Sequence, residues 1–124
     1  MSESQERRRV PTTAVRTRLE GSTTLPDERA AAVLSALADD DCRAILAAVR
    51  DRYRSVEEIA AATNVPTSTT YRKLDRLSEA GLLHEGSRLP CEGRPPTTYT
   101  AAVRDVRVAV ATEGPVVRVW RRPE

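Results

Sequence analysis

The chain has 124 residues, 40% hydrophobic and 31% charged, with a formal net charge of only +2. That length suits one small domain with some tail, and no apolar run approaches the roughly 18–20 residues of a membrane span. The two cysteines, Cys42 and Cys91, are far apart in the sequence, which argues against a disulfide scaffold. Together with the absence of a signal-peptide pattern, this predicts a cytoplasmic protein. One histidine, and no phosphate loop or nucleophile elbow, give no support for an enzyme.

Charge is unevenly distributed along the chain. Residues 1–24 lack hydrophobic periodicity and are rich in Ser, Thr, Arg and Glu, which predicts a disordered, basic N-terminal tail. Residues 27–64 hold eight acidic against five basic residues, whereas residues 65–104 hold six basic against four acidic ones. A polyanionic partner is therefore expected to meet the second half of the chain.

Two helices are predicted after the tail. Pro26 and two following acidic residues are typical of a helix start. The first apolar stripe then has helical spacing, and consists of Ala30, Val33, Leu34 and Leu37. The acidic residues 39–41 supply an N-cap for a second helix, whose stripe consists of Cys42, Ile45, Leu46 and Val49.

A second pair of helices with a tight turn between them is predicted next. Ser55 and Glu58 form a capping box that opens a short third helix. Asn64 lies where the chain must turn, and Asn tolerates the left-handed conformation. The fourth helix, about 67–80, places Thr70, Leu74 and Leu77 on its inner face and ends at Gly81.

Beyond Gly81 the pattern becomes extended. Residues 82–85 and 97–100 are expected to form two strands around a loop at 86–96. Apolar residues then alternate at 106–110, and a turn at 112–115 leads to a last strand at 116–120. The layout predicts an α+β fold: a winged helix-turn-helix domain at 25–104, with three to four helices and a two-stranded wing, followed by a C-terminal β-hairpin at 105–124.

Several motifs resemble those of known regulators. The segment from Leu37 to Leu46 resembles the opening of ArsR-type regulators, with Leu-x-Asp followed by Ile-Leu. Residues 65–83, which include Ser-Thr-Thr-Tyr-Arg, are similar to the recognition helices of ArsR-, IclR- and TrmB-like proteins. Gly-Arg-Pro-Pro-x-x-Tyr at 93–99 is similar to a common wing tip. The resemblance covers about residues 30–101, extends to small archaeal single-domain regulators, and implies a transcriptional regulator that binds double-stranded DNA.

Candidate DNA contacts follow from helix geometry, because an α-helix fits the major groove and its N-terminus favours phosphate. Arg72 can bond a guanine with its planar fork, whereas Lys73 and Arg76 are expected to contact phosphate. Arg88 and Arg94 in the wing loop are expected to lie near the minor groove. The full set is Thr67, Ser68, Thr69, Tyr71, Arg72, Lys73, Arg76, Arg88 and Arg94. A solvated helix face and a plain surface hairpin are the alternatives.

No metal or cofactor is expected, because the chain lacks clustered Cys, His and carboxylate ligands. Cys42 is expected to be a small core residue and His84 an ordinary edge-strand residue, while Cys91 leaves redox sensing as a minor alternative. A homodimer is expected, with the first helix as main contact and the terminal hairpin as contributor. The alternative function is a winged-helix module that binds a protein, such as a polymerase or a toxin.

Overall fold

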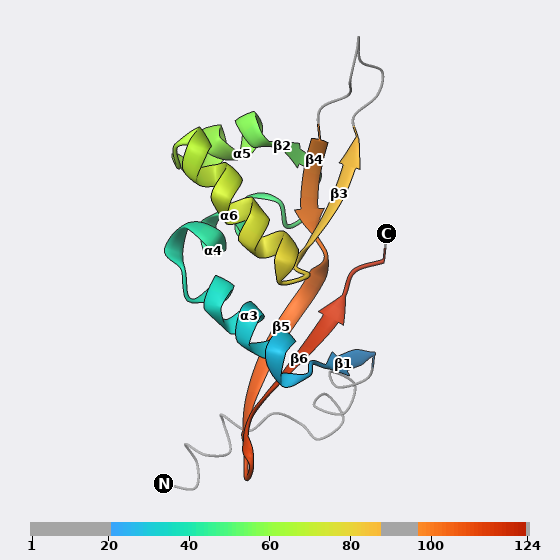
Figure 1. The fold of residues 1–124 in the computed structure, drawn as a ribbon. Helices are drawn as coiled ribbons and strands as arrows, with labels where there is room; N and C mark the ends of the chain where they lie inside the picture. Colours follow the sequence, from blue (N-terminus) through green and yellow to red (C-terminus); the bar gives the residue numbers. More distant parts are fainter. Residues whose placement is uncertain (1–20, 88–96, 124) are drawn as a thin grey trace, which may run out of the picture.

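The computed structural model describes residues 21–87 and 97–123, and its elements follow the predicted α+β order (Figure 1). The elements are β1 Ser22–Thr24, α3 Asp27–Leu37, α4 Asp40–Ala48, β2 Arg54–Ser55, α5 Val56–Thr63, α6 Thr67–Glu79, β3 Leu83–Ser87, β4 Thr97–Ala101, β5 Val103–Ala111 and β6 Gly114–Arg121. Four helices precede β3 and β4, which are the two predicted wing strands, and the C-terminal hairpin, as the periodicity indicated. No helix in these two ranges is long and apolar enough to cross a membrane.

The helix boundaries are set by local capping. The Asp39 side chain accepts a hydrogen bond from the Cys42 backbone N–H at 2.9 Å and caps α4. Ser55 and Glu58 form the predicted reciprocal capping box of α5. Asn64 has φ 61° at the end of α5, so it takes the left-handed conformation that the sharp turn into α6 requires. These three predictions are confirmed.

The helical core is built mainly from aliphatic side chains. Ile45 of α4, Ile59 of α5 and Leu77 of α6 are all fully buried and belong to one cluster. Ile45 and Leu77 lie on the apolar stripes that the helical spacing predicted, and their packing with Ile59 brings α4, α5 and α6 together. Cys42 is fully buried in the same cluster, so its prediction as a core residue is confirmed.

The wing is a three-stranded antiparallel sheet with the order β2-β4-β3. The two predicted strands are confirmed, and they pair from Leu83↔Ala101 to Ser87↔Thr97. The short β2 was not predicted, because a strand of two residues has no periodicity of its own and exists only through its pairing with β4. The loop at 88–96, which includes Arg88, Cys91 and Arg94, lies outside the described residues.

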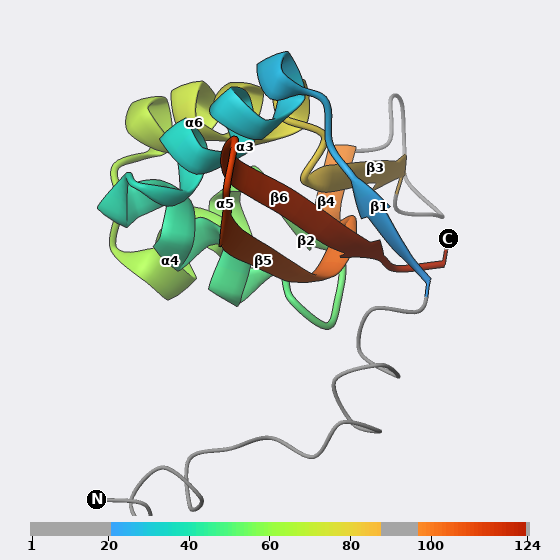
Figure 2. The same ribbon diagram turned by 90° about the horizontal axis from the view of Figure 1, so that it is seen from below.

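The C-terminal hairpin forms a second sheet with the order β1-β6-β5, separate from the wing sheet (Figure 2). Here the prediction of a disordered tail over residues 1–24 is wrong for its last residues, since Ser22–Thr24 pair with Arg118–Trp120 of β6. Their partner lies almost 100 residues later, so no local pattern could reveal this strand. Residues 1–20 lie outside the described residues.

One face of this second sheet completes the core of the helical layer. Val117 and Val119 of β6 are buried in the same cluster as Val33 and Ala36 of α3. β4 continues into β5 through Ala102, whose backbone N–H donates to the Leu82 carbonyl at 2.8 Å. The hairpin therefore packs against the helices and stabilises the position of α3.

Candidate nucleic-acid interface

The inner face of α6 fixes how the helix is rotated. Thr70, Leu74 and Leu77 are 0%, 1% and 0% exposed, as their spacing predicted. The Thr70 hydroxyl donates to the Pro66 carbonyl at 3.0 Å, so this buried polar group is paired. With this stripe held in the core, the remaining positions of α6 must face solvent or the neighbouring helices.

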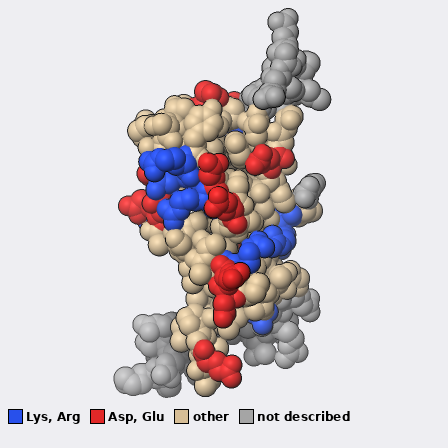
Figure 3. Space-filling view, viewed as in Figure 1, with Lys and Arg blue, Asp and Glu red and all other residues tan. Residues whose placement is uncertain are grey.

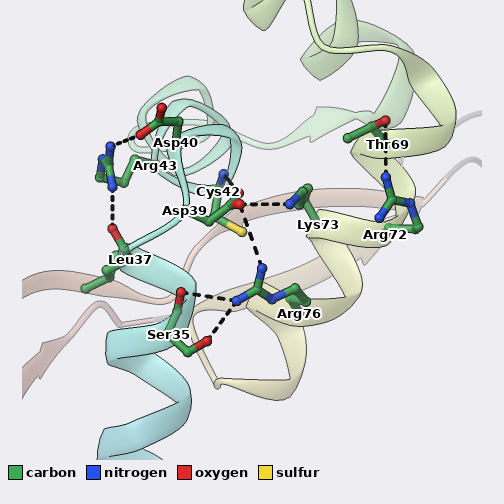
Figure 4. A network of polar contacts seen from close by, with 10 residues as sticks. All are labelled: Ser35, Leu37, Asp39, Asp40, Cys42, Arg43, Thr69, Arg72, Lys73 and Arg76. Carbon is green, nitrogen blue, oxygen red and sulfur yellow. Dashed lines mark hydrogen bonds and ion pairs between the residues drawn. The ribbon is translucent and has the colours of Figure 1, made fainter.

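The first two turns of α6 present small polar side chains and one large cation. Thr67, Ser68, Tyr71 and Arg72 are exposed, and Tyr71 keeps 51% of its surface. Arg72 Nη2 lies 3.4 Å from the hydroxyl of half-buried Thr69, which is the contact drawn in Figure 4. No side chain in the described part of the chain caps the N-terminus of α6, so its first backbone N–H groups remain open to an anion.

Lys73 does not lie on the outward face, contrary to the sequence prediction. Its side chain is only 14% exposed, and its Nζ donates to Asp39 Oδ1 at 2.8 Å. The reason is positional: Lys73 borders the buried stripe, three residues after Thr70, so its long side chain reaches the N-cap of α4. Figure 4 shows Lys73 and Arg76 both pointing from α6 toward Asp39.

Arg76 is also tied to the neighbouring helices. Its Nη2 donates to the Ser35 hydroxyl at 2.9 Å and to the Ser35 carbonyl at 3.1 Å, while its Nη1 lies 3.8 Å from Asp39 Oδ1. About 41% of the side chain remains exposed, so one side of the guanidinium still faces solvent. Arg76 therefore joins α6 to α3 and keeps part of its charge at the surface.

The electrostatics of this network depend on Asp39. The hydrogen bond from Lys73, together with the Cys42 backbone N–H, holds the pKa of the Asp39 carboxyl well below its ordinary value. Burial raises the pKa of the adjacent Cys42 thiol, and the nearby Asp39 carboxylate raises it further. Asp39 is therefore ionised and Cys42 protonated at neutral pH, which gives Cys42 the character of a core thiol rather than a reactive one.

Two residues of this network were missed as parts of the site. Asp39 was identified only as an N-cap, and Ser35 was not identified at all. Their contacts with α6 span 34 and 41 residues, so sequence spacing contains no signal for Ser35. For Asp39 the sequence does contain a signal, because it is an acidic residue placed just before a helix that packs on α6.

The charged surface around α6 is a patch rather than a continuous basic face. Figure 3 shows Lys and Arg atoms gathered over α6 and bordered on both sides by acidic side chains. The patch lies beside the open N-terminal turns of α6, where an anion would meet both the backbone N–H groups and the exposed arginine. Among the described residues, no group of three His, Cys, Asp or Glu side chains is placed to hold a metal ion.

The wing loop at 88–96 follows the last pair of the β3–β4 hairpin. Ser87 and Thr97 form this last pair, so the segment that contains Arg88 and Arg94 connects two neighbouring residues of the sheet. The positions of those two arginines are not described. His84 lies within β3 and pairs with Thr100, which agrees with the expected strand residue.

Comparisons with known proteins agree with this geometry. A family model described as a helix-turn-helix domain matches residues 37–86, which span α4, α5, α6 and the start of the wing. The crystal structure of NolR from Sinorhizobium fredii is similar over 61% of this chain and 71% of that one, with a TM-score of 0.52 and 22% sequence identity. No curated protein sequence matches the chain significantly. The chain therefore carries a helix-turn-helix domain, and with the strands β3 and β4 it has the winged helix-turn-helix fold that the sequence predicted.

Proposed function

We propose that this winged helix-turn-helix protein is a transcriptional regulator that binds double-stranded DNA in a sequence-specific manner, with α6 in the major groove. The fold supports DNA binding in general, since its match covers the two helices and the turn that form the reading unit. The exposed residues of α6 support the more specific proposal. They combine short hydroxyls, an aromatic ring and a planar cation within the first two turns.

The observation that carries the proposal is the exposure of Arg72. Among the three basic residues of α6, Lys73 and Arg76 are tied to Asp39 or Ser35. Within residues 21–87 and 97–123, the contact of Arg72 is a long one to a hydroxyl of its own helix. Its guanidinium can therefore form two parallel bonds to guanine O6 and N7 without breaking an ion pair. Thr67 and Ser68 lie one turn earlier, where they can approach the DNA backbone.

We assign a second role to Lys73 and Arg76 beside the phosphate contacts expected from the sequence. Both hold α6 against the N-terminus of α4 and against α3, so they set the angle at which α6 meets DNA. Arg76 is the better phosphate contact of the two, because 41% of its side chain is exposed against 14% for Lys73. Arg88 and Arg94 of the wing loop remain proposed contacts near the minor groove.

We further propose that the protein acts as a homodimer in the cytoplasm and has no enzymatic activity. One winged domain contacts few base pairs, whereas two copies related by a two-fold axis read two half-sites about one helical turn apart. A dimer needs a surface beyond the reading unit. The helix α3 and the hairpin β5–β6 are among the described elements that lie outside it.

The test compares Arg72→Ala with wild type on a site selected from random duplex DNA, by electrophoretic shift at two salt concentrations. Loss of a bidentate guanine contact is expected to cost about 1–3 kcal/mol and to relax preference at one base position. Arg118→Ala is the matched control, because Arg118 lies on β6 with its guanidinium near Ser22, away from α6. Wild-type affinity and selectivity for Arg72→Ala would refute the assignment. No binding of any duplex by wild type would favour the protein-interaction module instead.

A further inference from the structure

The strand β5 presents an open edge with exposed valines. It is the outer strand of the β1-β6-β5 sheet and, in the described part of the chain, pairs only with β6 (Figure 2). Val108 is 51% exposed and Val110 is 90% exposed, on a stretch from 108 to 111 that contains no charged residue. Proteins normally protect such an edge with charges, proline or a covering segment, because it is ready to pair with another strand.

The backbone groups of the valines point toward this open edge. Leu25 N–H donates to the Val117 carbonyl at 2.9 Å, so the backbone of Val117 faces away from β5. Val108 lies opposite Val117, which makes this a pair without mutual hydrogen bonds, and the N–H and C=O of Val108 therefore point outward. The alternation extends to Val106 and to Val110, whose partner Pro115 has no N–H to donate.

A groove of about 270 Å³ lies beside the first half of β5. Its apolar lining includes Leu37, Leu46 and Val106, and its charged lining has two basic residues, Arg50 and Arg104, against the acidic Asp105. The hairpin tip at the other end of β5 carries the complementary features, namely the exposed Val110 and the acidic Glu113. One end of the strand therefore offers an apolar groove with basic residues, and the other end an apolar residue followed by an acid.

A second copy of this chain fits both features at once. In an antiparallel pair centred on Val108, Val110 of each copy lies opposite Val106 of the other, next to the groove. The same register brings the acidic turn residue Glu113 beside the other copy's Arg104. Arg107 then faces the small Ala109, and its guanidinium is already held near Asp105 and over the Trp120 ring.

Charge and backbone contacts disfavour the neighbouring registers. Centring the pair on Arg107 would place two arginines directly opposite each other, and centring it on Ala109 would bring Glu113 against Asp105. Centring it on Val106 would require the backbone of Ala102, whose N–H and C=O already bond to Leu82 and Arg122. Among the four registers compared, the Val108 register is the one that combines opposite charges with outward-pointing backbone groups.

We infer that two copies of this chain form a homodimer through antiparallel pairing of their β5 edges, centred on Val108, which joins the two C-terminal sheets into one of six strands. The inference deepens the homodimer of the proposed function, yet it stands on the sheet edge and does not require DNA binding. It also moves the main dimer contact from α3 to the hairpin, because Val33 and Ala36 of α3 are buried in the core of their own chain.

Sedimentation equilibrium of the full chain, without DNA, tests the pairing. Wild type is expected to show a dimer of twice 13.7 kDa at micromolar concentration. Val110→Lys places two charges in the apolar contact and is expected to weaken the dimer at least about tenfold. Ala61→Lys, which adds the same charge at an exposed position of α5 outside the β1-β6-β5 sheet, is the matched control and is expected to change the dimer constant less than about threefold.

Charge reversal tests the register. Arg104→Glu and Glu113→Arg are each expected to weaken the dimer about tenfold, because like charges then meet twice, and the double variant is expected to recover most of the loss. A monomeric wild type at about 100 µM, or a dimer that Val110→Lys leaves unchanged, would overturn the inference. A dimer that binds no duplex would overturn the proposed DNA binding alone. A monomer that binds DNA would overturn this inference together with the proposed homodimer, and would leave the proposed DNA binding in place.

Discussion

At the residue scale, Asp39 connects α6, the proposed DNA-recognition helix, to the rest of the domain. It caps α4, accepts the Lys73 ammonium and lies near Arg76, so one carboxylate joins two helices. The position of α6 relative to α4 therefore depends on a charged contact as well as on the core. A change at this position should alter both stability and DNA binding, even though Asp39 itself need not touch DNA.

Asp39→Asn isolates the charge, because Asn is also a good N-cap and keeps the side-chain oxygen that accepts from Cys42. The folded pKa of Asp39 is lowered, so its contribution to stability is present above the ordinary value of 3.8 and is lost as the pH falls through the folded value. The variant is expected to melt at lower temperature than wild type at pH 7, with a difference that shrinks below about pH 4. Thermal melts by circular dichroism between pH 2 and 8 measure it. A difference independent of pH would show that the cap, not the charge, is responsible.

The residue scale also shows where sequence reasoning about the site was limited. The spacing of Thr70, Leu74 and Leu77 determined which face of α6 is buried, and this prediction is confirmed. The same spacing left Lys73 at the border of the buried stripe. Only the folded position of Asp39 decides that the Lys73 ammonium turns inward, so the division between contact and positioning residues required the structure.

At the element scale, the local signals were strong wherever an element is capped by its own residues. Asp39, Ser55 and Asn64 begin or end helices through contacts within a few residues, and all three were predictable. The strands β1 and β2 were not, because each has only two or three residues and depends on a partner strand distant in sequence. Short strands are created by tertiary pairing, which a local pattern does not contain.

The capping box of α5 provides the prediction at this scale. Ser55→Ala removes the hydroxyl that accepts the Glu58 backbone N–H at 3.2 Å, and is expected to lower the free energy of unfolding by about 1 kcal/mol. Urea denaturation measures the change. Glu57→Ala is the control, since Glu57 is exposed on the same turn and takes no part in the box. Equal losses for the two variants would mean that the loss at Ser55 is no larger than that of another change in the first turn, and would contradict a specific role of the capping box.

At the scale of the whole molecule, the sequence indicated a winged domain followed by a hairpin, but not how the two sheets are divided. The alternation of Val106, Val108 and Val110 showed that one face of the hairpin is apolar. Which part of that face α3 covers depends on the path of the chain through Ala102 and on the pairing of β1 with β6. The exposed edge that results, with Val108 and Val110 uncovered, could be recognised only in the folded chain.

The two proposals meet in the salt dependence of DNA binding. Each phosphate contact releases counterions, so the slope of log K against log salt grows in proportion to the number of contacts. If two copies bind one two-fold symmetric site, the wild-type slope is expected to be about twice that of Val110→Lys, which binds a half-site as a monomer. Fluorescence anisotropy between about 50 and 200 mM salt gives both slopes. Val110 lies on the hairpin and not on α6, so a lower slope reflects the lost copy rather than a lost contact. Equal slopes, with the variant shown to be monomeric, would mean that each copy binds DNA alone.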